Sequence, residues 1–279
     1  MPELPEIETI RRSLQNRVMN RHISDVFLFR DDYLLPGSHD IHSVKKKAIL
    51  AIERRGKFLA IHLSDDWILI HHLGMSGRLL LTHPETEIAR HTHIRIGLAE
   101  DSLELRQWDP RRFGFVGILK ESELSELPSW HNLGTDPFEL KLEYFLQLLR
   151  ERKQPIKSFL LDQRWVAGLG NIYADESLFR AGIHPLRPAG ELTREEGKKL
   201  LHHIRQVLRE SIAAGGSSTH DYQHLDGTLG EFQHKHRVYR RIGEPCRICK
   251  STIERIVING RSSHFCPCCQ PIPSPNSKR

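Results

Sequence analysis

Two cysteine pairs near the C-terminal end of the chain constrain its fold more strongly than any other feature. Cys246 and Cys249 form one CxxC pair, Cys266 and Cys269 form a second, and sixteen residues separate the pairs. Two tight turns with this spacing can present four thiolates to one tetrahedral zinc ion, so we predict one structural zinc ion here. Cys268 is an alternative to Cys269, which we favour because it makes the two turns equivalent.

The segment between the cysteine pairs has the pattern of a β-hairpin. Apolar and polar residues alternate from Ile253 to Phe265, and Asn259-Gly260 supplies a turn. Arg261 follows this turn, where an exposed cation could contact a phosphate group. All 5 cysteines of the 279-residue chain lie in this one region, a clustering typical of metal binding rather than of a disulfide framework.

The first part of the chain is expected to form one helix followed by strands. Ile7, Ile10 and Leu14 recur at helical spacing and predict a helix over Pro5 to Leu14. From residue 23 to about residue 118 the pattern changes to strands, with two hairpins at 57–70 and 93–108. We therefore predict a β-sandwich or barrel that carries the N-terminal helix.

A second, helical part follows a boundary at Gly134-Thr135-Asp136-Pro137. Thr193 and Glu196 have the spacing of a capping box and open a long amphipathic helix. A polar loop is expected over 217–230, and the Pro- and Ser-rich tail 271–279 is expected to be disordered. The apolar periodicity predicts helices over 142–149, 156–162, 171–182 and 193–212.

Charge and hydropathy narrow the class of protein. The chain has 41 basic and 35 acidic residues, a formal net charge of +6, which slightly favours a polyanionic partner. We find no uncharged apolar run of membrane-spanning length, so no membrane partner is expected. The N-terminus is acidic and contains proline, unlike a secretory signal, and we expect a cytoplasmic protein.

The N-terminal residues could supply a nucleophile. If Met1 is removed, Pro2 becomes the first residue and carries a free secondary amine with a pKa near ~8, far below that of lysine. Such an amine can attack a sugar C1′ and form a cationic iminium, which supports base loss and phosphate elimination. Glu3 could donate the proton, and Glu6, one helical turn later, could hold the N-terminus in place.

Several motifs lie between the proline and the cysteine pairs, in one order along nearly the whole chain. Their glycine and basic residues fall in segments with the pattern of turns. The motifs are Met1-Pro2-Glu3-Leu4-Pro5-Glu6-Ile7-Glu8-Thr9, Arg54-Arg55-Gly56-Lys57-Phe58, His72-Leu73-Gly74-Met75-Ser76-Gly77-Arg78, Asp109-Pro110-Arg111-Arg112-Phe113-Gly114, Gly168-Leu169-Gly170-Asn171-Ile172-Tyr173-Ala174-Asp175-Glu176 and Gly215-Gly216-Ser217-Ser218.

This series closely resembles the motifs of the formamidopyrimidine-DNA glycosylase family. Leu4 resembles the residue of the formamidopyrimidine branch, whereas the endonuclease VIII branch typically has glycine at this position. The resemblance implies an α+β, multidomain fold. It comprises an N-terminal β-sandwich with an N-terminal helix, a helix-two-turn-helix domain and a C-terminal four-cysteine zinc-finger β-hairpin. The implied domains are 1–133, 134–220 and 221–270, the last containing a lesion loop and the zinc finger, followed by the tail 271–279.

The resemblance also implies an activity. The family excises oxidised purines, 8-oxoguanine and formamidopyrimidines, from double-stranded DNA and cleaves abasic sites by β,δ-elimination through a Schiff base. The implied roles are Pro2 as nucleophile, Glu3 as proton donor with Glu6 in support, and Lys57 as a phosphate contact that assists the chemistry. A monomer is expected, associated with the nucleoid when it is bound to DNA.

Further residues are implied to contact DNA. Asn171 and Arg261 would grip phosphates beside an extruded nucleotide, and His72 and His91 would lie near the same backbone. An extruded base leaves a hole in the duplex, so apolar and aromatic side chains must replace the lost stacking. The trio implied to fill this hole is Met75, Arg111 and Phe113, with Arg111 pairing with the orphaned cytosine.

The chain departs from the family pattern in places that leave base preference open. Gln223-His224-Leu225, in the loop over the flipped base, are not the residues we expect there. Arg240 stands where family members usually have glycine, and Lys235-His236-Arg237 is more basic than usual. The departures bear on base preference and not on the elimination chemistry, so one alternative is the same chemistry directed at oxidised pyrimidines. A separate alternative is a catalytically silent, zinc-dependent binder of damaged or distorted DNA, against which Pro2, Glu3 and Lys57 together argue.

Overall fold

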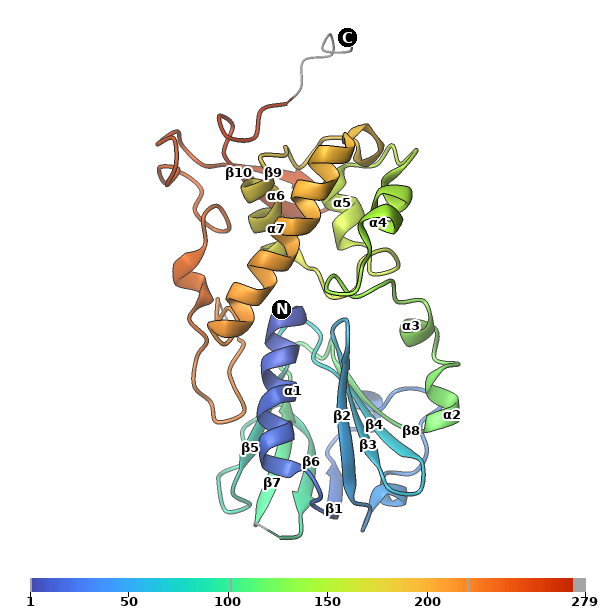
Figure 1. The fold of residues 1–279 in the computed structure, drawn as a ribbon. Coiled ribbons are helices and arrows are strands. Elements are labelled where there is room, and N and C mark those ends of the chain that lie inside the picture. Colours follow the sequence, from blue (N-terminus) through green and yellow to red (C-terminus); the bar gives the residue numbers. More distant parts are fainter. Residues whose placement is uncertain (1, 101, 220, 273–279) are drawn as a thin grey trace. The chain divides into compact units, whose positions relative to one another are not determined.

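The computed structural model describes residues 2–100, 102–219 and 221–272, which form two compact units (Figure 1). The first unit comprises Met1–Asn132 and Ser211–Gln233, and the second comprises Leu133–Glu210 and His234–Arg279. The units are not consecutive in the chain, because Ser211–Gln233 packs with the N-terminal part. No helix of the described residues is both long enough and apolar enough to cross a membrane.

The first unit is a β-sandwich with one long helix. Its two sheets have the strand orders β1-β6-β7-β5 and β2-β3-β4-β8, and every pair of neighbouring strands is antiparallel. The predicted N-terminal helix is present as α1, Leu4–Val18. The strands are β1 (Ile23–Leu28), β2 (Ile49–Arg55), β3 (Phe58–Leu63), β4 (Trp67–His72), β5 (Arg78–Thr82), β6 (Thr92–Leu98), β7 (Leu103–Trp108) and β8 (Phe115–Lys120).

The sandwich core explains the sequence pattern. Ile7, Ile10 and Leu14 of α1 are buried in one cluster with inward-facing residues of both sheets. Both predicted hairpins are present, as β3–β4 and β6–β7, because alternating apolar residues need one buried face. Short helical segments in this unit are Asp31–Tyr33, Ile41–Val44, α2 (Glu121–Leu124) and α3 (Pro128–His131).

The second unit is helical and carries the hairpin. Its helices are α4 (Leu142–Leu149), α5 (Ile156–Leu161), α6 (Asn171–Ala181) and α7 (Arg194–Ala213), whose last residues enter the first unit. The expected capping box opens α7, since Thr193 N donates to Glu196 Oε2 at 2.8 Å and Glu196 N to Thr193 Oγ1 at 3.2 Å. Strands β9 (Glu254–Ile258) and β10 (Arg261–Phe265) pair as the predicted hairpin.

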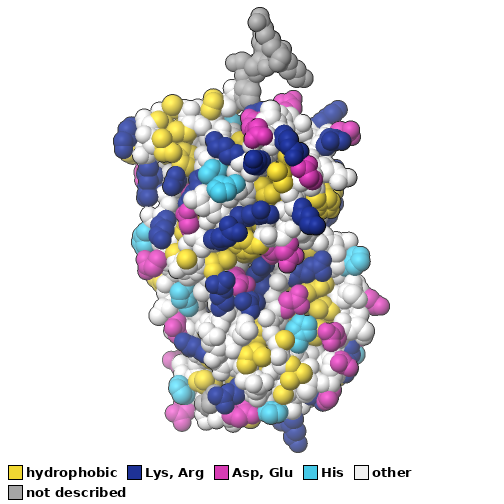
Figure 2. Space-filling view, in the orientation of Figure 1, with side chains coloured by type: hydrophobic (Ala, Val, Ile, Leu, Met, Phe, Trp, Pro, Cys, Tyr) yellow, Lys and Arg dark blue, Asp and Glu magenta, His cyan; other side chains and the backbone are white. Residues whose placement is uncertain are grey.

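Charged side chains of both signs are mixed on the one face of the molecule that Figure 2 shows. On the face shown in Figure 2, Lys and Arg side chains alternate with Asp and Glu side chains and with small apolar patches. This pattern agrees with the modest net charge of +6. Disorder is predicted for the tail 271–279, of which residues 273–279 lie outside the described residues.

Candidate active site

The N-terminal residues lie at a packed surface. Pro2 and Glu3 are buried, and α1 begins immediately after them. Glu6 is also buried, and its Oε2 accepts a hydrogen bond from Glu3 N at 2.8 Å. This bond satisfies one of the amide groups that a helix N-terminus leaves without a helical partner. Glu6 therefore fixes the backbone next to Pro2.

A second segment packs on the same carboxylate. Ser217 N donates to Glu6 Oε1 at 2.8 Å, and Tyr222 Oη donates to the Glu6 carbonyl at 3.5 Å. Gly216 has φ +85°, and a Cβ there would stand only 3.0 Å from Glu6 Oε1. The glycine motif is thus required by the close approach of this loop to the N-terminus.

Lys57 lies in the turn between β2 and β3 and is partly buried. The strand before it is tied to α1, because Arg54 Nε donates to Glu8 Oε2 at 3.2 Å. Burial alone would raise the pKa of Glu8, but hydrogen bonds from Arg11 and Arg12 and the charge of Arg54 hold it at about 2. Glu8 is therefore ionised at neutral pH and joins the helix to the sheet next to Lys57.

The expected void-filling side chains lie on two loops of the first unit. Met75 is 38% exposed and Phe113 is 55% exposed, so neither is a core residue. The Arg111 guanidinium carbon is 4.9 Å from the Phe113 ring centre, within the range of a cation–π contact. Large apolar side chains held in solvent in this way are available for a partner.

The two histidines differ from each other. His72 ends β4 and packs against Phe58 and Phe115, with ring centres 4.8 and 5.5 Å away. Burial, with the nearby charge of Lys57, lowers the pKa of His72 to about 4, so its ring is neutral at pH 7. His91 is partly exposed, has φ +73°, and accepts a hydrogen bond from Asp109 N through its carbonyl.

The unexpected residues of the polar loop have structural partners in the first unit. Gln223 Oε1 accepts from Arg78 at 2.8 Å, and His224 Nε2 is 2.7 Å from the Gly215 carbonyl. Leu225 is buried in the sandwich core, and its carbonyl accepts from Leu81 N. These three side chains therefore anchor the loop instead of pointing freely into solvent.

In the second unit, Asn171 is the first residue of α6 and Arg261 the first of β10. Asn171 Oδ1 is buried and has no hydrogen-bond partner among the described residues. Arg261 is exposed after a tight turn in which Asn259 has φ +48° and Gly260 has φ +74°. The exposed Arg261 side chain can therefore take a partner from outside this unit.

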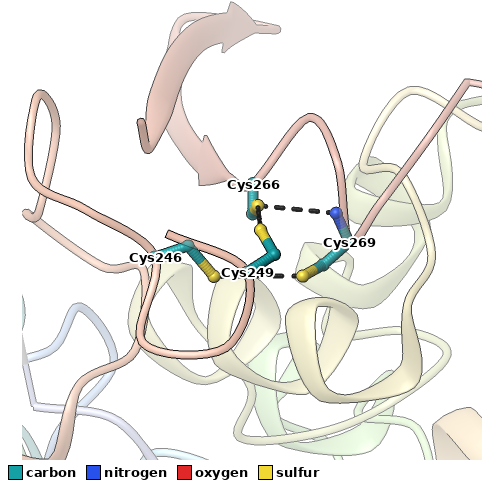
Figure 3. A group of neighbouring side chains, drawn as sticks. All are labelled: Cys246, Cys249, Cys266 and Cys269. Carbon is teal, nitrogen blue, oxygen red and sulfur yellow. Dashed lines mark hydrogen bonds between the residues drawn. The ribbon is translucent and has the colours of Figure 1, made fainter. Parts of the chain in front are cut away.

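The four predicted cysteine sulfurs converge in the second unit (Figure 3). The Cys246 and Cys269 sulfurs are 3.9 Å apart and those of Cys249 and Cys266 are 3.4 Å apart. Sulfurs around a tetrahedral zinc ion are about 3.8 Å apart for bonds of about 2.3 Å, so the donor set and its spacing fit zinc. Cys269 lies in this cluster, while Cys268 is exposed.

Two buried carboxylates in the second unit carry no role in the sequence analysis. Glu176 accepts hydrogen bonds at 2.9 Å from the backbone of Arg237, Val238 and Tyr239. Asp175 Oδ1 is 2.6 Å from the Lys157 ammonium nitrogen. Both acids belong to the same motif as Asn171. Their hydrogen-bond and ion-pair partners are distant in sequence, so no local spacing could identify those partners.

Comparison with known families decides the relationship. Residues 1–116 match the formamidopyrimidine-DNA glycosylase N-terminal domain, 133–223 match its H2TH domain, and 243–272 match the zinc finger found in FPG and IleRS. The formamidopyrimidine-DNA glycosylase of Desulfitobacterium hafniense is 44% identical over 97% of this chain and 100% of its own length. The chain belongs to the formamidopyrimidine-DNA glycosylase family. It is thus a DNA-repair glycosylase of the zinc-finger type.

Other formamidopyrimidine-DNA glycosylases support this membership. The protein of Hahella chejuensis is 41% identical over 97% of this chain and its whole length. A solved structure of the Thermus thermophilus MutM (Fpg) protein is 40% identical and superposes with a TM-score of 0.87, covering 96% of this chain and 98% of that one. Lactococcus lactis Fpg in complex with abasic-site DNA is 34% identical, with a TM-score of 0.90 over 97% and 100% of the two chains.

Proposed function

We propose that this chain excises oxidised purines from duplex DNA and then cleaves the strand at the abasic site through its N-terminal proline. The observation that carries the proposal is the buried Pro2-Glu3 start, whose backbone is fixed by the carboxylate of Glu6. Support comes from relatives that are named formamidopyrimidine-DNA glycosylase. Structures of Lactococcus lactis Fpg with DNA that contains Fapy-dG or an abasic site give further support. The preferred opposite base is proposed to be cytosine.

The chemistry begins with removal of Met1, which leaves the Pro2 nitrogen as a secondary amine. With a pKa near ~8, a useful fraction of this amine is neutral at pH 7 and can attack C1′ of the extruded nucleotide. The bond between C1′ and the base breaks, and Glu3 supplies a proton during base departure and ring opening. The product is an iminium between Pro2 and C1′.

The iminium then serves as an electron sink. Loss of a C2′ proton expels the 3′ phosphate, and a second elimination expels the 5′ phosphate. Water then hydrolyses the iminium, which releases the sugar remnant and restores the free Pro2 amine. Lys57, in the turn after β2, is proposed to hold a phosphate beside the lesion. Glu6 acts through the backbone and not on the DNA, because its oxygens are bonded to Glu3 N and Ser217 N.

The remaining site residues are proposed to hold the DNA. His72 and His91 would form hydrogen bonds near the DNA backbone. His72 would do so as a neutral ring at pH 7. Asn171 would donate to a phosphate through its Nδ2 amide group, and Arg261 through its exposed guanidinium. Met75, Arg111 and Phe113 would fill the space of the extruded base.

One zinc ion is proposed to be held by Cys246, Cys249, Cys266 and Cys269. All four donors are thiolates, which leaves no open position, so the ion would supply structure rather than catalysis. The cysteines bracket the β9–β10 hairpin, and Arg261 begins β10. We therefore expect Cys246→Ser to weaken DNA binding by loosening the hairpin that carries Arg261.

Borohydride trapping on a duplex with 8-oxoguanine opposite cytosine tests the proposal. The wild-type protein, with Met1 removal confirmed by mass, should form a covalent complex. Pro2→Gly, which replaces the secondary amine by a primary one, should trap more slowly, and Glu3→Gln should lose base excision. Failure of the wild-type protein to trap would leave only a silent binder of damaged DNA. Faster trapping on an oxidised pyrimidine would change the substrate class; one Lactococcus lactis Fpg structure contains such DNA.

A further inference from the structure

Met75 and the pair Arg111 and Phe113 lie on two crossovers between the same two sheets. The β4–β5 loop (73–77) leaves β4 at His72, and the β7–β8 loop (109–114) leaves β7 at Trp108. Strand β4, where the first loop begins, pairs with β8, where the second loop ends. Strand β5, where the first loop ends, pairs with β7, where the second loop begins. The topology therefore places the two loops side by side at one end of the sandwich.

One buried carboxylate joins the two loops. Asp109 has no solvent-exposed surface, and its Oδ1 accepts a hydrogen bond from Ser76 Oγ of the β4–β5 loop at 2.6 Å. Within its own loop, Oδ2 accepts from Gly114 N at 2.8 Å and Oδ1 from Arg111 N at 3.3 Å. This single group therefore fixes the backbone on both sides of Phe113.

A chain of buried groups holds this carboxylate in turn. His71 Nδ1 lies 2.7 Å from Gln107 Oε1, Gln107 Nε2 donates to Tyr33 Oη at 2.8 Å, and Tyr33 Oη donates to Asp109 Oδ2 at 3.4 Å. Burial and the charge of Asp109 raise the pKa of Tyr33, which keeps its hydroxyl as a donor. Each member has a defined direction of donation, so the network orients Asp109 uniquely.

Two glycines bring the loop backbones into direct contact. A Cβ on Gly74 would stand 2.5 Å from Gly114 N, and one on Gly114 would stand 2.5 Å from the His72 carbonyl and 2.7 Å from Tyr33 Oη. These separations are far below ordinary contact distances, so any side chain would push the loops apart. The loops are packed as closely as two backbones allow.

We propose that Asp109 is a positioning residue that makes the two loops one rigid body, so that Met75, Arg111 and Phe113 enter the duplex together. The inference rests on the proposed function, because it assumes that these three side chains occupy the hole left by the extruded base. Preorganisation of this kind removes the cost of ordering the two loops when DNA binds. The positioning residue contacts neither the base nor the sugar.

Comparison of two DNA substrates separates this role from a loss of folding. Excision of 8-oxoguanine from a duplex requires the hole to be filled, whereas an abasic sugar in a single strand leaves no stack and no orphaned base. We expect Asp109→Asn to lower the single-turnover rate on the duplex by about 10- to 100-fold. Borohydride trapping on the single-stranded abasic oligonucleotide should stay at the wild-type rate.

Glu104→Gln is the matched control. Glu104 lies in β7 and is a buried carboxylate, as is Asp109, which directly follows that strand. Unlike Asp109, Glu104 bonds Arg95 and Arg106 within the sheet. This variant should leave the ratio of the two rates unchanged, even if its stability falls. Ser76→Ala removes the bond between the loops alone and should lower the ratio in the same direction as Asp109→Asn.

The outcomes are distinct. A fall of both rates in parallel for Asp109→Asn, or a wild-type ratio for Ser76→Ala, overturns the positioning role. If Asp109→Asn does not fold, Ser76→Ala alone decides. A wild-type protein that acts on neither substrate instead refutes the proposed function, and the control variants then have no rate to compare.

Discussion

At the scale of single residues, the N-terminus depends on one carboxylate with two backbone donors. Glu6 is nearly fully buried, and each of its oxygens accepts one hydrogen bond, from Glu3 N and from Ser217 N. The sequence alone predicts that Glu6 supports the N-terminus, since it lies one turn after Glu3. Its second bond joins residues 211 positions apart, which no local pattern contains.

Glu6→Gln should disturb this arrangement because an amide offers one acceptor oxygen where the carboxylate offers two. One of the two buried N–H groups then loses its partner, which costs about 1–3 kcal/mol in the free energy of unfolding. The amide also sets its own N–H donor against one of these backbone N–H groups, so the backbone beside Pro2 is held less firmly and the trapping rate should fall. Urea unfolding and borohydride trapping measure both effects, with exposed Glu143→Gln as control. An unchanged trapping rate would show that Glu6 does not position the nucleophile.

His71 should make the first unit sensitive to acid. Its ring is fully buried, and burial lowers its pKa to about 4, against about 6.5 in an unfolded chain. Between these values the unfolded state binds a proton that the folded state does not, so stability is lost as pH falls from about 6.5 to about 4. The loss amounts to about 3 kcal/mol at most.

His71→Gln removes this contribution while keeping a polar side chain next to Gln107. The difference in unfolding free energy between pH 7 and pH 4.5, measured by urea unfolding, should therefore be smaller for the variant than for the wild-type protein. Equal differences would mean that His71 does not titrate on unfolding.

A departure from the family pattern also has its explanation at the residue scale. Arg240 stands where the resemblance predicts glycine, and its φ is +61°, in the left-handed region that glycine adopts without strain. The sequence shows the substitution, but only the backbone angle shows why glycine is usual there.

At the scale of elements, an ion pair ties two helices to the hairpin of the second unit. Lys157 of α5 and Asp175 of α6 are both fully buried and 2.6 Å apart. Lys157 Nζ also donates to the Ser262 carbonyl of β10 at 2.6 Å, and Asp175 Oδ2 accepts from His264 N at 2.9 Å. Helical and strand periodicity predict these elements well, but periodicity cannot say which buried charges meet across them.

Lys157→Met should be strongly destabilising, because it leaves the Asp175 charge buried without its cation. Breaking one partner of a buried pair costs about 3–5 kcal/mol, whereas replacing both partners by apolar residues is often neutral. The double variant Lys157→Met with Asp175→Leu should therefore unfold at a higher urea concentration than Lys157→Met alone. If the double variant is the less stable of the two, the bonds of Asp175 to β10 matter more than the ion pair.

At the scale of the whole molecule, the fold followed from patterns that repeat locally, while the site depends on buried polar groups that join distant segments. The cysteine spacing, the capping box and the strand alternation each state a local rule. Asp109 and Glu176 follow no such rule, since they bind backbone groups whose positions exist only after folding. The sequence motifs include Asp109 and Glu176 but do not show which groups form hydrogen bonds with them.

Zinc removal should act on DNA binding through Arg261 alone if the ion is purely structural. Each cation that contacts a phosphate adds about 1 to the slope of log affinity against log salt. Arg261→Ala should therefore lower this slope by about 1, and so should chelation of the wild-type protein, because the hairpin that carries Arg261 is then released. Fluorescence anisotropy with abasic-site duplex measures the slope. After zinc is removed with a chelator, the wild-type protein and Arg261→Ala should bind DNA with the same affinity, because the contact between Arg261 and the phosphate is already lost in both. A further loss in the chelated variant would show that the zinc cluster holds a second group on the DNA.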